Sequence, residues 1–567
     1  MLNELYTVRG ENLSGIPWDI YPRPQMKRDS YLNLNGEWEF SVRDKGFPKS
    51  YDRKIILPFC PESILSGVNQ HFSEGTSLCY RRFVTMPEGF HQGRVLLHIG
   101  AADQHLECFV NDKKVGSHSG GYDNITFDIT HALVDGENEI RFRCMDDLRN
   151  QLMPYGKQVL PEKRGGMWYT PVSGIWQSVW MESVPETYIK KLNIENRAYS
   201  VTISTVPALE GKVVVPELGE FTLENGSVTI IPENPNLWSP ENPHLYDFSV
   251  ETKSDKVESY FAIRSLEIKK VGNYPRLCLN GKPYFFHGLL DQGYWPEGLL
   301  TAPAPESFAD DILAMKALGF NMLRKHIKVE PEEFYYQCDK LGMVVFQDMV
   351  NNSDYNFLRD TVLPTVGIQK LDDRNLHKDE NSRREFLREA EAAVNQLKNH
   401  PSICYWTIFN EAWGQFDSDN VFEIFRRWDD TRFIDSTSGW FRREKTDVDS
   451  RHVYFRKVKL AGDGKKPLVL SEFGGKTYKA EGHLFNPDKS YGYGGCDTLE
   501  GLNEAVKKLY LDEVLPCIPK GLCAAVYTQV SDVEDEINGL LTYDRKLCKL
   551  KPEVMVPVAE ALQSAMK

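Results

Sequence analysis

The chain has 567 residues, which suggests three or four domains at roughly 150 residues each, and its 41% hydrophobic and 26% charged content is ordinary for a soluble globular protein. A formal net charge of −14 disfavours nucleic acid and anionic membranes as main partners, because phosphate binding requires a positive field. The first residues carry no basic region followed by an apolar core, and no apolar run reaches the ~20 residues that span a bilayer, so we expect a cytoplasmic protein.

Residues 1–184 are expected to form a β-sandwich of the jelly-roll type. Short runs of alternating apolar and polar residues recur there, and turn pairs such as Asn35–Gly36 and Asp135–Gly136 separate them. Regular short strands with such turns are typical of sandwiches and jelly rolls. The expected strands are 38–42, 79–84, 94–99, 106–110, 139–144 and 175–181.

Residues 185–267 continue with strand-like runs and have the length of a small immunoglobulin-like sandwich. The Pro-rich stretch 232–243 interrupts these runs. It is interpreted as an ordered loop rather than a linker, because Trp238 within it and Leu245 just after it are suitable anchors. The expected strands are 201–205, 212–215, 227–231 and 245–250.

From residue 268 to 567 apolar strands alternate with helical stretches, and this alternation predicts a (β/α)₈ TIM barrel. The expected strands are 284–290, 322–326, 343–348, 403–409, 434–437, 453–455, 468–471 and 524–528. The expected helices are 307–318, 331–340, 383–398, 421–431, 498–511 and 554–566.

Eleven cysteines are scattered along the chain, with no CxxC pair and no Cys/His cluster of zinc spacing, so no metal site and no cofactor are expected. Five of them lie within apolar runs and are interpreted as buried thiols of a reducing compartment. These are Cys108, Cys144, Cys338, Cys404 and Cys523.

Two glutamates stand where a barrel places its chemistry, at the carboxyl ends of strands. Glu411 follows the fourth expected strand, in an aromatic run that otherwise excludes charge, and Glu472 follows the seventh. Two carboxylates facing each other over a pocket suit glycoside hydrolysis: one protonates the leaving oxygen and the other attacks the anomeric carbon. A single glutamate after a strand is more often a solvated loop residue, so the hypothesis depends on the pair.

Several motifs resemble glycoside hydrolase family 2, which contains β-galactosidases, β-glucuronidases and β-mannosidases. They are the run 110–130 (VNDKKVGSHSGGYDNITFDIT), residues 173–180 (SGIWQSVW), residues 399–402 (NHPS) and the pair Asn410–Glu411. The resemblance covers nearly the whole chain. It implies a sugar-binding sandwich, an immunoglobulin-like domain and a catalytic barrel, which matches the division made from the pattern.

The resemblance also implies roles for individual residues in a retaining mechanism. Glu411 is the general acid/base and Glu472 the nucleophile. Asn410 holds the sugar 2-hydroxyl, with a helix cap as the alternative role. Arg324 and His326 end strand two where the family has an Arg and a His, although the spacing to the His is one residue shorter here. Tyr454 resembles a tyrosine that holds the nucleophile, and a core tyrosine is the alternative.

Other candidates for the substrate pocket come from position alone, at or near strand ends. They are Asp291, Trp295, Asp348, Trp413, Trp440 and Gln529. A Trp at such a site either stacks on a sugar face or closes the barrel, and both interpretations stay open.

The sequence leaves several classes of sugar as candidate substrates. The glucuronidases of the family carry Asn–x–Lys shortly before a Gly–x–x–Thr–x–Asp–Arg run, and here Glu536–Ile–Asn538 precedes Gly539–Arg545. An acid where a cation is needed disfavours a β-glucuronide, unless Lys476 or Lys479 substitutes. The expected activity is β-galactosidase, with β-mannoside, β-galactofuranoside and α-L-arabinopyranoside as alternatives. A carbohydrate-binding protein with an inactive barrel is the non-enzymatic alternative, and homo-oligomerisation is left open.

Overall fold

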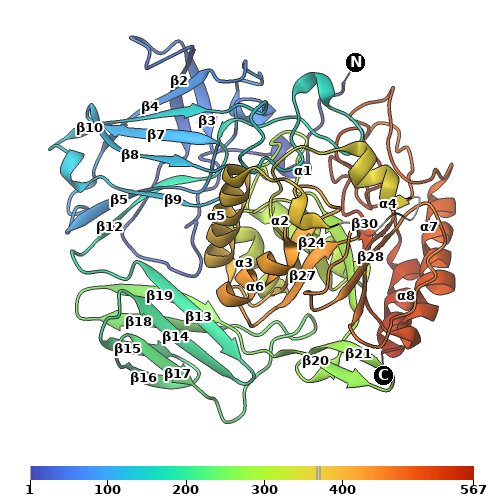
Figure 1. Cartoon of the computed structure of the whole chain (residues 1–567). Coiled ribbons are helices and arrows are strands. Elements are labelled where there is room, and N and C mark those ends of the chain that lie inside the picture. Colours follow the sequence, from blue (N-terminus) through green and yellow to red (C-terminus); the bar gives the residue numbers. More distant parts are fainter. Residues whose placement is uncertain (1, 366–367, 369–371, 567) are drawn as a thin grey trace.

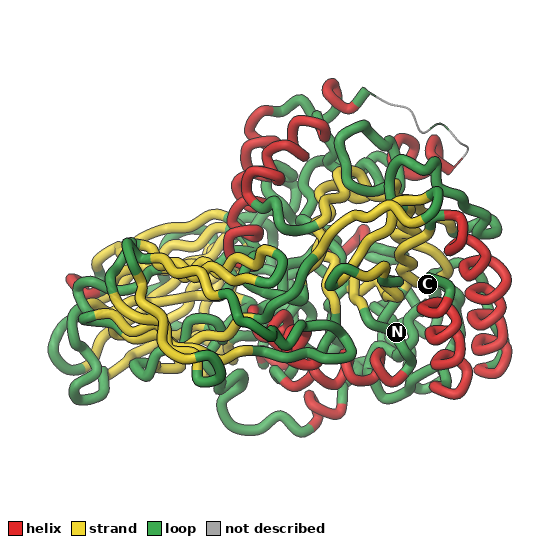
Figure 2. The backbone as a smooth tube through the Cα atoms, turned by 90° about the horizontal axis from the view of Figure 1, so that it is seen from below, coloured by secondary structure: helices red, strands yellow, loops and turns green. Residues whose placement is uncertain are grey.

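The computed structural model describes residues 2–365, 368 and 372–566 and contains two β-sandwiches and one barrel (Figure 1). The sandwiches lie on one side of the molecule and the barrel with its ring of helices on the other (Figure 2). Each body has its own cluster of buried side chains, so each has its own hydrophobic core.

The first sandwich consists of antiparallel sheets whose strands alternate between core and solvent. In β10, for example, Ile140, Phe142 and Cys144 are buried while the residues between them are only partly covered. One sheet has the order β3 (Arg53–Leu57), β2 (Gly36–Arg43), β4 (Ser77–Thr85), β10 (Glu137–Met145), β7 (His105–Val110), β8 (Lys113–Ser119). The facing sheet has the order β1 (Tyr31–Asn33), β12 (Val179–Val184), β5 (Arg94–Ile99), β9 (Ile125–Asp128), and β6 (Ala102–Asp103) pairs with β11 (Gly174–Ile175).

The second sandwich packs a three-stranded sheet against a four-stranded one. The first has the order β13 (Lys191–Arg197), β14 (Ser200–Val206), β17 (Ser227–Ile230), and the second β16 (Gly219–Leu223), β15 (Gly211–Val215), β18 (Tyr246–Thr252), β19 (Lys256–Phe261). Trp238 in the Pro-rich loop is fully buried, and its indole N–H donates to the carbonyl of Asp339 over 2.7 Å. Trp238 therefore anchors the loop, as the sequence predicted, and the structure shows that it does so on the barrel.

Eight parallel strands form a nearly closed barrel, in which seven neighbouring pairs are hydrogen-bonded. The sheet order is β27 (Phe433–Ser438), β26 (Ile403–Asn410), β25 (Val344–Asp348), β24 (Met322–Lys325), β23 (Phe286–Asp291), β30 (Leu522–Thr528), β29 (Leu468–Gly474), β28 (Asp449–Val453). A hairpin of β20 (Leu266–Val271), β21 (Tyr274–Leu279) and β22 (Lys282–Pro283) precedes the barrel. Leu277 of this hairpin belongs to the same buried cluster as the inward-facing strand residues.

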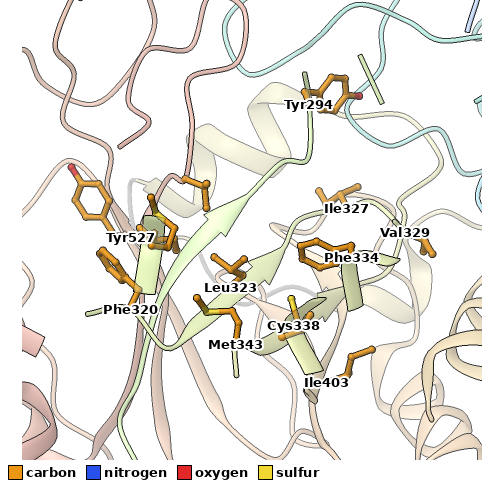
Figure 3. Close-up of a cluster of buried hydrophobic side chains, with 14 of the residues drawn as sticks. Tyr294, Phe320, Leu323, Ile327, Val329, Phe334, Cys338, Met343, Ile403 and Tyr527 are labelled. Atoms are coloured by element: carbon orange, nitrogen blue, oxygen red, sulfur yellow. The ribbon is translucent and has the colours of Figure 1, made fainter. Parts of the chain in front are cut away.

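Six long helices cover the outside of the barrel. They are α2 (Glu306–Ala317), α3 (Glu332–Leu341), α5 (Glu380–Leu397), α6 (Ser418–Trp428), α7 (Leu499–Lys508) and α8 (Pro552–Ser564). In α5 the buried residues Phe386, Ala390, Ala393 and Leu397 recur at helical spacing, and Asp379 caps the first turn. Outward-facing Leu323 of β24 lies in one cluster with Phe334 and Cys338 of α3 (Figure 3).

Two consecutive crossovers of the barrel lack a helix. Residues 439–448 join β27 to β28 and residues 454–467 join β28 to β29 without any helical segment. Short helical segments occur elsewhere: α1 (Val8–Glu11), α4 (Leu363–Thr365), η1 (Ile64–Ser66), η2 (Thr130–Ala132), η3 (Pro161–Lys163), η4 (Leu358–Val362), η5 (Asp373–Asn375), η6 (Leu509–Val514) and η7 (Leu515–Lys520).

The single strand expected at 175–181 is two strands in different sheets, β11 (Gly174–Ile175) and β12 (Val179–Val184). The sixth barrel strand was also misplaced, because β28 spans Asp449–Val453 and not 453–455. Its sequence, DSRHV, is too polar to be recognised as a buried strand. Ser450 and His452 are nevertheless buried in it. The five cysteines predicted to be buried are buried.

Candidate active site

The two glutamates meet at the carboxyl end of the barrel. Glu411 directly follows β26. Glu472 lies near the carboxyl end of β29, which continues to Gly474. One oxygen of each carboxylate and one nitrogen of His452 all lie within 4.8 Å of one another. The Glu411 side chain is 18% exposed and that of Glu472 is 5% exposed, so Glu411 is the more accessible of the two to solvent.

The backbone turns sharply where it presents Glu411. Glu411 and Ala412 have φ values of +49° and +65°, in the left-handed region that non-glycine residues seldom adopt. The amide of Glu411 donates to the carbonyl of Ser438 over 3.0 Å, which ties this turn to the end of the neighbouring β27. Such a conformation persists only where the surrounding structure enforces it, and it is frequent at functional sites.

Glu472 is held as a carboxylate by two donors. Arg324 Nη1 donates to its Oε1 over 3.1 Å, and the hydroxyl of Tyr454 donates to its Oε2 over 2.5 Å. Burial by itself raises the pKa of Glu472, but the positive charges of His452 and Arg324 outweigh it and lower the pKa to about 2. The side chain is therefore ionised at neutral pH.

Arg324 connects the remaining polar groups of the floor. It is 1% exposed, and its guanidinium donates to Asp348 Oδ1 over 2.9 Å and to Asn410 Oδ1 over 2.9 Å. The other oxygen of Asp348 lies 2.7 Å from Nδ1 of His326. Burial raises the pKa of Asp348, and the adjacent Arg324 and His326 reverse this effect and bring it below its ordinary value. Arg324, His326, Asp348 and Asn410 thus form one network with Glu472.

His452 is the residue of the site that sequence reasoning missed. Its Nδ1 lies 2.7 Å from Glu411 Oε1 and 3.7 Å from Glu472 Oε2, and its Nε2 lies 3.0 Å from the Ser438 hydroxyl. Correct placement of β28 would have found it, since His452 lies two positions after Ser450 and alternation points both into the barrel.

Trp413, Trp440 and Gln529 lie at the mouth with different surroundings. The Trp413 indole donates to the carbonyl of Ser353 over 3.1 Å, and Trp440 lies with its ring 5.5 Å from that of His452. Gln529 is fully buried and donates to Asn538 Oδ1 over 2.9 Å. Trp440 thus contacts His452, which in turn contacts Glu411, whereas Gln529 contacts Asn538, the partner of Glu536.

Asp291 and Trp295 lie outside this network. Asp291 Oδ2 is 2.6 Å from Nζ of Lys325, a side chain that packs over the Phe334 ring of α3 and hence faces the outer helices. Trp295 is packed against Phe308 and lies under the guanidinium of Arg545 at 4.1 Å. The structure does not bring either residue together with Glu411 and Glu472. Asp291, the last residue of β23, faces the outer helices, and Trp295 lies in the loop after this strand.

The first sandwich also reaches the barrel mouth. Trp168 packs edge-on against Trp413 with ring centroids 5.2 Å apart, and the Tyr169 hydroxyl donates to Glu536 Oε2 over 2.6 Å. Asn538 donates to the other oxygen of Glu536 over 3.0 Å. Burial raises the pKa of Glu536 above its ordinary value. This sandwich loop has no strand or helix pattern in the sequence, so nothing there indicated that it approaches the site.

Among the described residues, the group Glu411, His452 and Glu472 has the spacing of a cation site. Both oxygens of Glu472 already accept hydrogen bonds, one of them from the guanidinium of Arg324, and a metal ion there would meet that positive charge at short range. The donor set therefore suits a carboxylate pair better than a metal, and the expectation of no metal stays a prediction.

Comparison with known proteins identifies all three parts of the chain. Residues 66–185 match "Glycosyl hydrolases family 2, sugar binding domain", residues 186–264 match "Glycosyl hydrolases family 2", and residues 270–493 match "Glycosyl hydrolases family 2, TIM barrel domain". No helix among the described residues is long and apolar enough to cross a membrane.

Similar proteins carry more than one activity in their names. A putative beta-glucuronidase of Formosa agariphila is 24% identical over 71% of this chain and 49% of its own length. A beta-galactosidase of Thermoanaerobacter pseudethanolicus is 24% identical over 82% of this chain and 62% of its own length. The chain thus spans about half to two thirds of these relatives. The structure of a beta-D-glucuronidase of Dictyoglomus thermophilum superposes with a TM-score of 0.71 at 19% identity, covering 96% of this chain and 98% of that one.

Proposed function

The chain belongs to glycosyl hydrolase family 2, and we propose that it is a retaining, exo-acting β-glycosidase with Glu472 as nucleophile and Glu411 as general acid/base. The main support for this proposal is the short distance between the two carboxylates, which have oxygens within 4.8 Å of each other. Carboxyl groups ~5–5.5 Å apart are typical of retaining enzymes, whereas inverting enzymes separate them by ~6.5–9.5 Å to admit a water molecule.

The surroundings of the two glutamates support this division of roles. Glu472, with its pKa lowered to about 2, is ionised and can attack the anomeric carbon while Glu411 protonates the departing oxygen. Glu411 then removes a proton from water, which cleaves the glycosyl ester at Glu472 and releases the sugar with its original anomeric configuration. Glu411 is the more exposed of the two, as a group that exchanges protons with leaving group and water must be.

Three further side chains are proposed to act on the substrate or the nucleophile. Arg324 donates a hydrogen bond to the side-chain oxygen of Asn410, so the NH₂ group of Asn410 is available to bind a sugar hydroxyl. Tyr454 neutralises part of the charge on Glu472 before attack, because its hydroxyl donates to Oε2. His452 positions Glu411 through the contact of 2.7 Å.

For the sugar, we propose a neutral β-galactoside in preference to a uronide. Glu536 and Asn538 stand before the Gly539–Arg545 run, where a glucuronidase of the family would have a lysine for the sugar carboxylate. Both side chains are buried, and Asn538 donates a hydrogen bond to Glu536. Of the two lysines that could substitute, Lys479 is exposed, and Lys476 lines a cleft whose lining residues include Tyr454 but neither Glu411 nor Glu472. The names of several relatives favour the second candidate, a β-glucuronidase, for which this part of the site lacks the expected cation.

Matched aryl glycosides test the proposal, because a galactoside and a galacturonide differ only at carbon six. We expect the wild-type enzyme to cleave nitrophenyl β-galactoside at least about tenfold better in kcat/KM than the β-galacturonide, and the β-glucoside better than the β-glucuronide. The anomeric configuration of the first product, followed by NMR, tests retention. A preference for either uronide overturns the neutral-sugar proposal, while an inverted first product overturns the assigned roles of the glutamates.

A further inference from the structure

The gap left by the missing barrel helices contains a cleft of 850 Å³ that the catalytic proposal does not use. Its walls are the loop after β28, the end of β29 near Lys476, and the segment α7–η6–η7. In a barrel with all its helices, a helix after β28 would occupy this side of the strands. Here the connection is the loop 454–467, and Figure 1 shows β28 and α7 at the same edge of the barrel.

The cleft has the opposite charge to the rest of the molecule. The chain carries a formal net charge of −14, yet six basic side chains line the cleft against only two acidic ones, Asp512 and Glu513. The basic residues are Arg456, Lys457, Lys459, Lys476, Lys508 and Lys520. A concave surface lined by one sign of charge concentrates its field and attracts ligands of the other sign.

Most of these charges have no carboxylate partner among the described residues. Glu504 lies 3.9 Å from Lys508, and Glu513 accepts a hydrogen bond from the backbone amide of Val458. Within the described part of the chain, no carboxylate lies within ion-pair distance of Arg456, Lys457, Lys459, Lys476 or Lys520. Five unpaired cations around one cleft repel each other, and an anionic ligand would remove that repulsion.

One end of the cleft, lined by Tyr454, Phe455 and Tyr493, is aromatic and lies next to Glu472. Tyr454 lines the cleft and donates its hydroxyl to Glu472, so a single side chain separates the two. Tyr493 stacks on Tyr454 with ring centroids 4.0 Å apart, and Phe455 packs edge-on against Tyr493 while remaining 75% exposed. Exposed aromatic faces beside polar groups suit the apolar faces of sugar rings.

We propose that this basic cleft binds the part of an acidic glycan that lies beyond the sugar being cleaved, with sulfate or carboxylate groups on the lysines and a ring on Phe455. The proposal rests on the glycosidase function for its choice of a glycan. It differs from the sugar specificity proposed above, since the terminal sugar that enters the pocket is neutral and the negative charge belongs to the remainder of the chain.

Equilibrium binding to the full-length Glu472→Gln variant tests the cleft without turnover. The probes are a chondroitin sulfate tetrasaccharide, a hyaluronan tetrasaccharide, which carries carboxylates only, and the neutral cellotetraose. We expect either acidic probe to bind at least about tenfold more tightly than the neutral one, and its affinity to fall as salt is added. Binding of the sulfated probe alone identifies sulfate as the recognised group, and binding of both identifies any anion.

A charge-matched pair of variants assigns the binding to the cleft. Lys457→Gln/Lys459→Gln/Lys520→Gln removes three exposed cleft charges, and Lys49→Gln/Lys253→Gln/Lys270→Gln removes three exposed charges elsewhere. The cleft triple variant should weaken acidic-probe binding about tenfold or more, and the control triple variant should leave it nearly unchanged. Phe455→Ala should weaken binding of acidic probes without altering their salt dependence.

Equal loss in both triple variants, or equal affinity for neutral and acidic probes, would overturn the cleft assignment. Failure of the glycosidase proposal gives a different result: the wild-type enzyme would cleave no aryl glycoside, while the cleft would still bind the acidic probes. The cleft triple variant should hydrolyse a small neutral aryl glycoside as well as the wild type, since none of its three lysines contacts Glu411 or Glu472.

Discussion

Replacing Arg324 with methionine tests whether one buried guanidinium sets the charge state of the proposed nucleophile. Methionine has a similar length but no charge and no donors, so the change removes the bonds to Asp348, Glu472 and Asn410 with little loss of volume. Two buried carboxylates would then lack their common partner.

The size of the effect follows from the pKa of Glu472, which is lowered from 4.5 to about 2 in the folded protein. That difference corresponds to about 3 kcal/mol. His452 is the largest of the causes that lower the pKa, and Arg324 is the next. Because the folded pKa is the lower one, Glu472 stabilises the fold above its unfolded pKa of 4.5, and this contribution is lost as pH falls toward 2. Without Arg324 the pKa of folded Glu472 should rise toward its unfolded value, so the contribution of this ionisation to stability at neutral pH should shrink. The carboxylates left without their partner should cost about 3–5 kcal/mol of unfolding free energy.

The assay is the pH dependence of kcat/KM on the preferred aryl glycoside, with unfolding monitored in the same buffers. The acid limb of Arg324→Met should lie about one pH unit or more above that of the wild type, because Glu472 must be ionised to attack. Arg432→Met is the matched control, since Arg432 is buried and paired with Asp429 at 3.0 Å outside the site. It should lose stability without moving the limb. If the acid limb of folded Arg324→Met coincides with that of the wild type, Arg324 does not govern the ionisation of Glu472.

Three other predictions follow from the same geometry. Azide should rescue Glu472→Ala and yield a glycosyl azide of inverted configuration, whereas Glu411→Ala with azide should yield the retained anomer; the same anomer from both variants would contradict the roles. Tyr454→Phe should lower kcat about 10- to 100-fold with the fold intact, because it removes one hydrogen bond to a charged group; an unchanged kcat would make Tyr454 a core residue. Gly439 has φ +87°, and a Cβ there would meet the His452 ring at 2.6 Å. We therefore expect Gly439→Ala and His452→Ala both to reduce kcat, because each disturbs the contact of His452 with Glu411, and circular dichroism should show that both variants are folded.

The order of the domains and the class of the fold could be predicted because they depend on local periodicity. Alternation of period two in β10 and helical spacing in α5 follow from the need to bury one face of each element, and both patterns are visible in the sequence. The polar strand β28 escaped this reasoning, because residues that line a functional site break the apolar pattern of a buried strand.

The candidate site could be predicted only in part. A glutamate placed after a buried aromatic strand is costly enough to be noticed, so Glu411 and its counterpart Glu472 were found, and their roles stay predictions. His452 and the basic cleft were not found, since their neighbours are distant in sequence: His452 meets Glu411 across 41 positions, and the cleft joins loop 454–467 to η7.

The sequence by itself determined most of the strands and helices and which acids stand at strand ends, because these depend on neighbours a few residues away. Only the tertiary structure decided that Arg324 is shared between Asp348, Glu472 and Asn410, and that Asp291 and Trp295 face the outer helices. A shift of one position along a strand reverses the face on which a side chain lies, and closure of the barrel alone fixes that position.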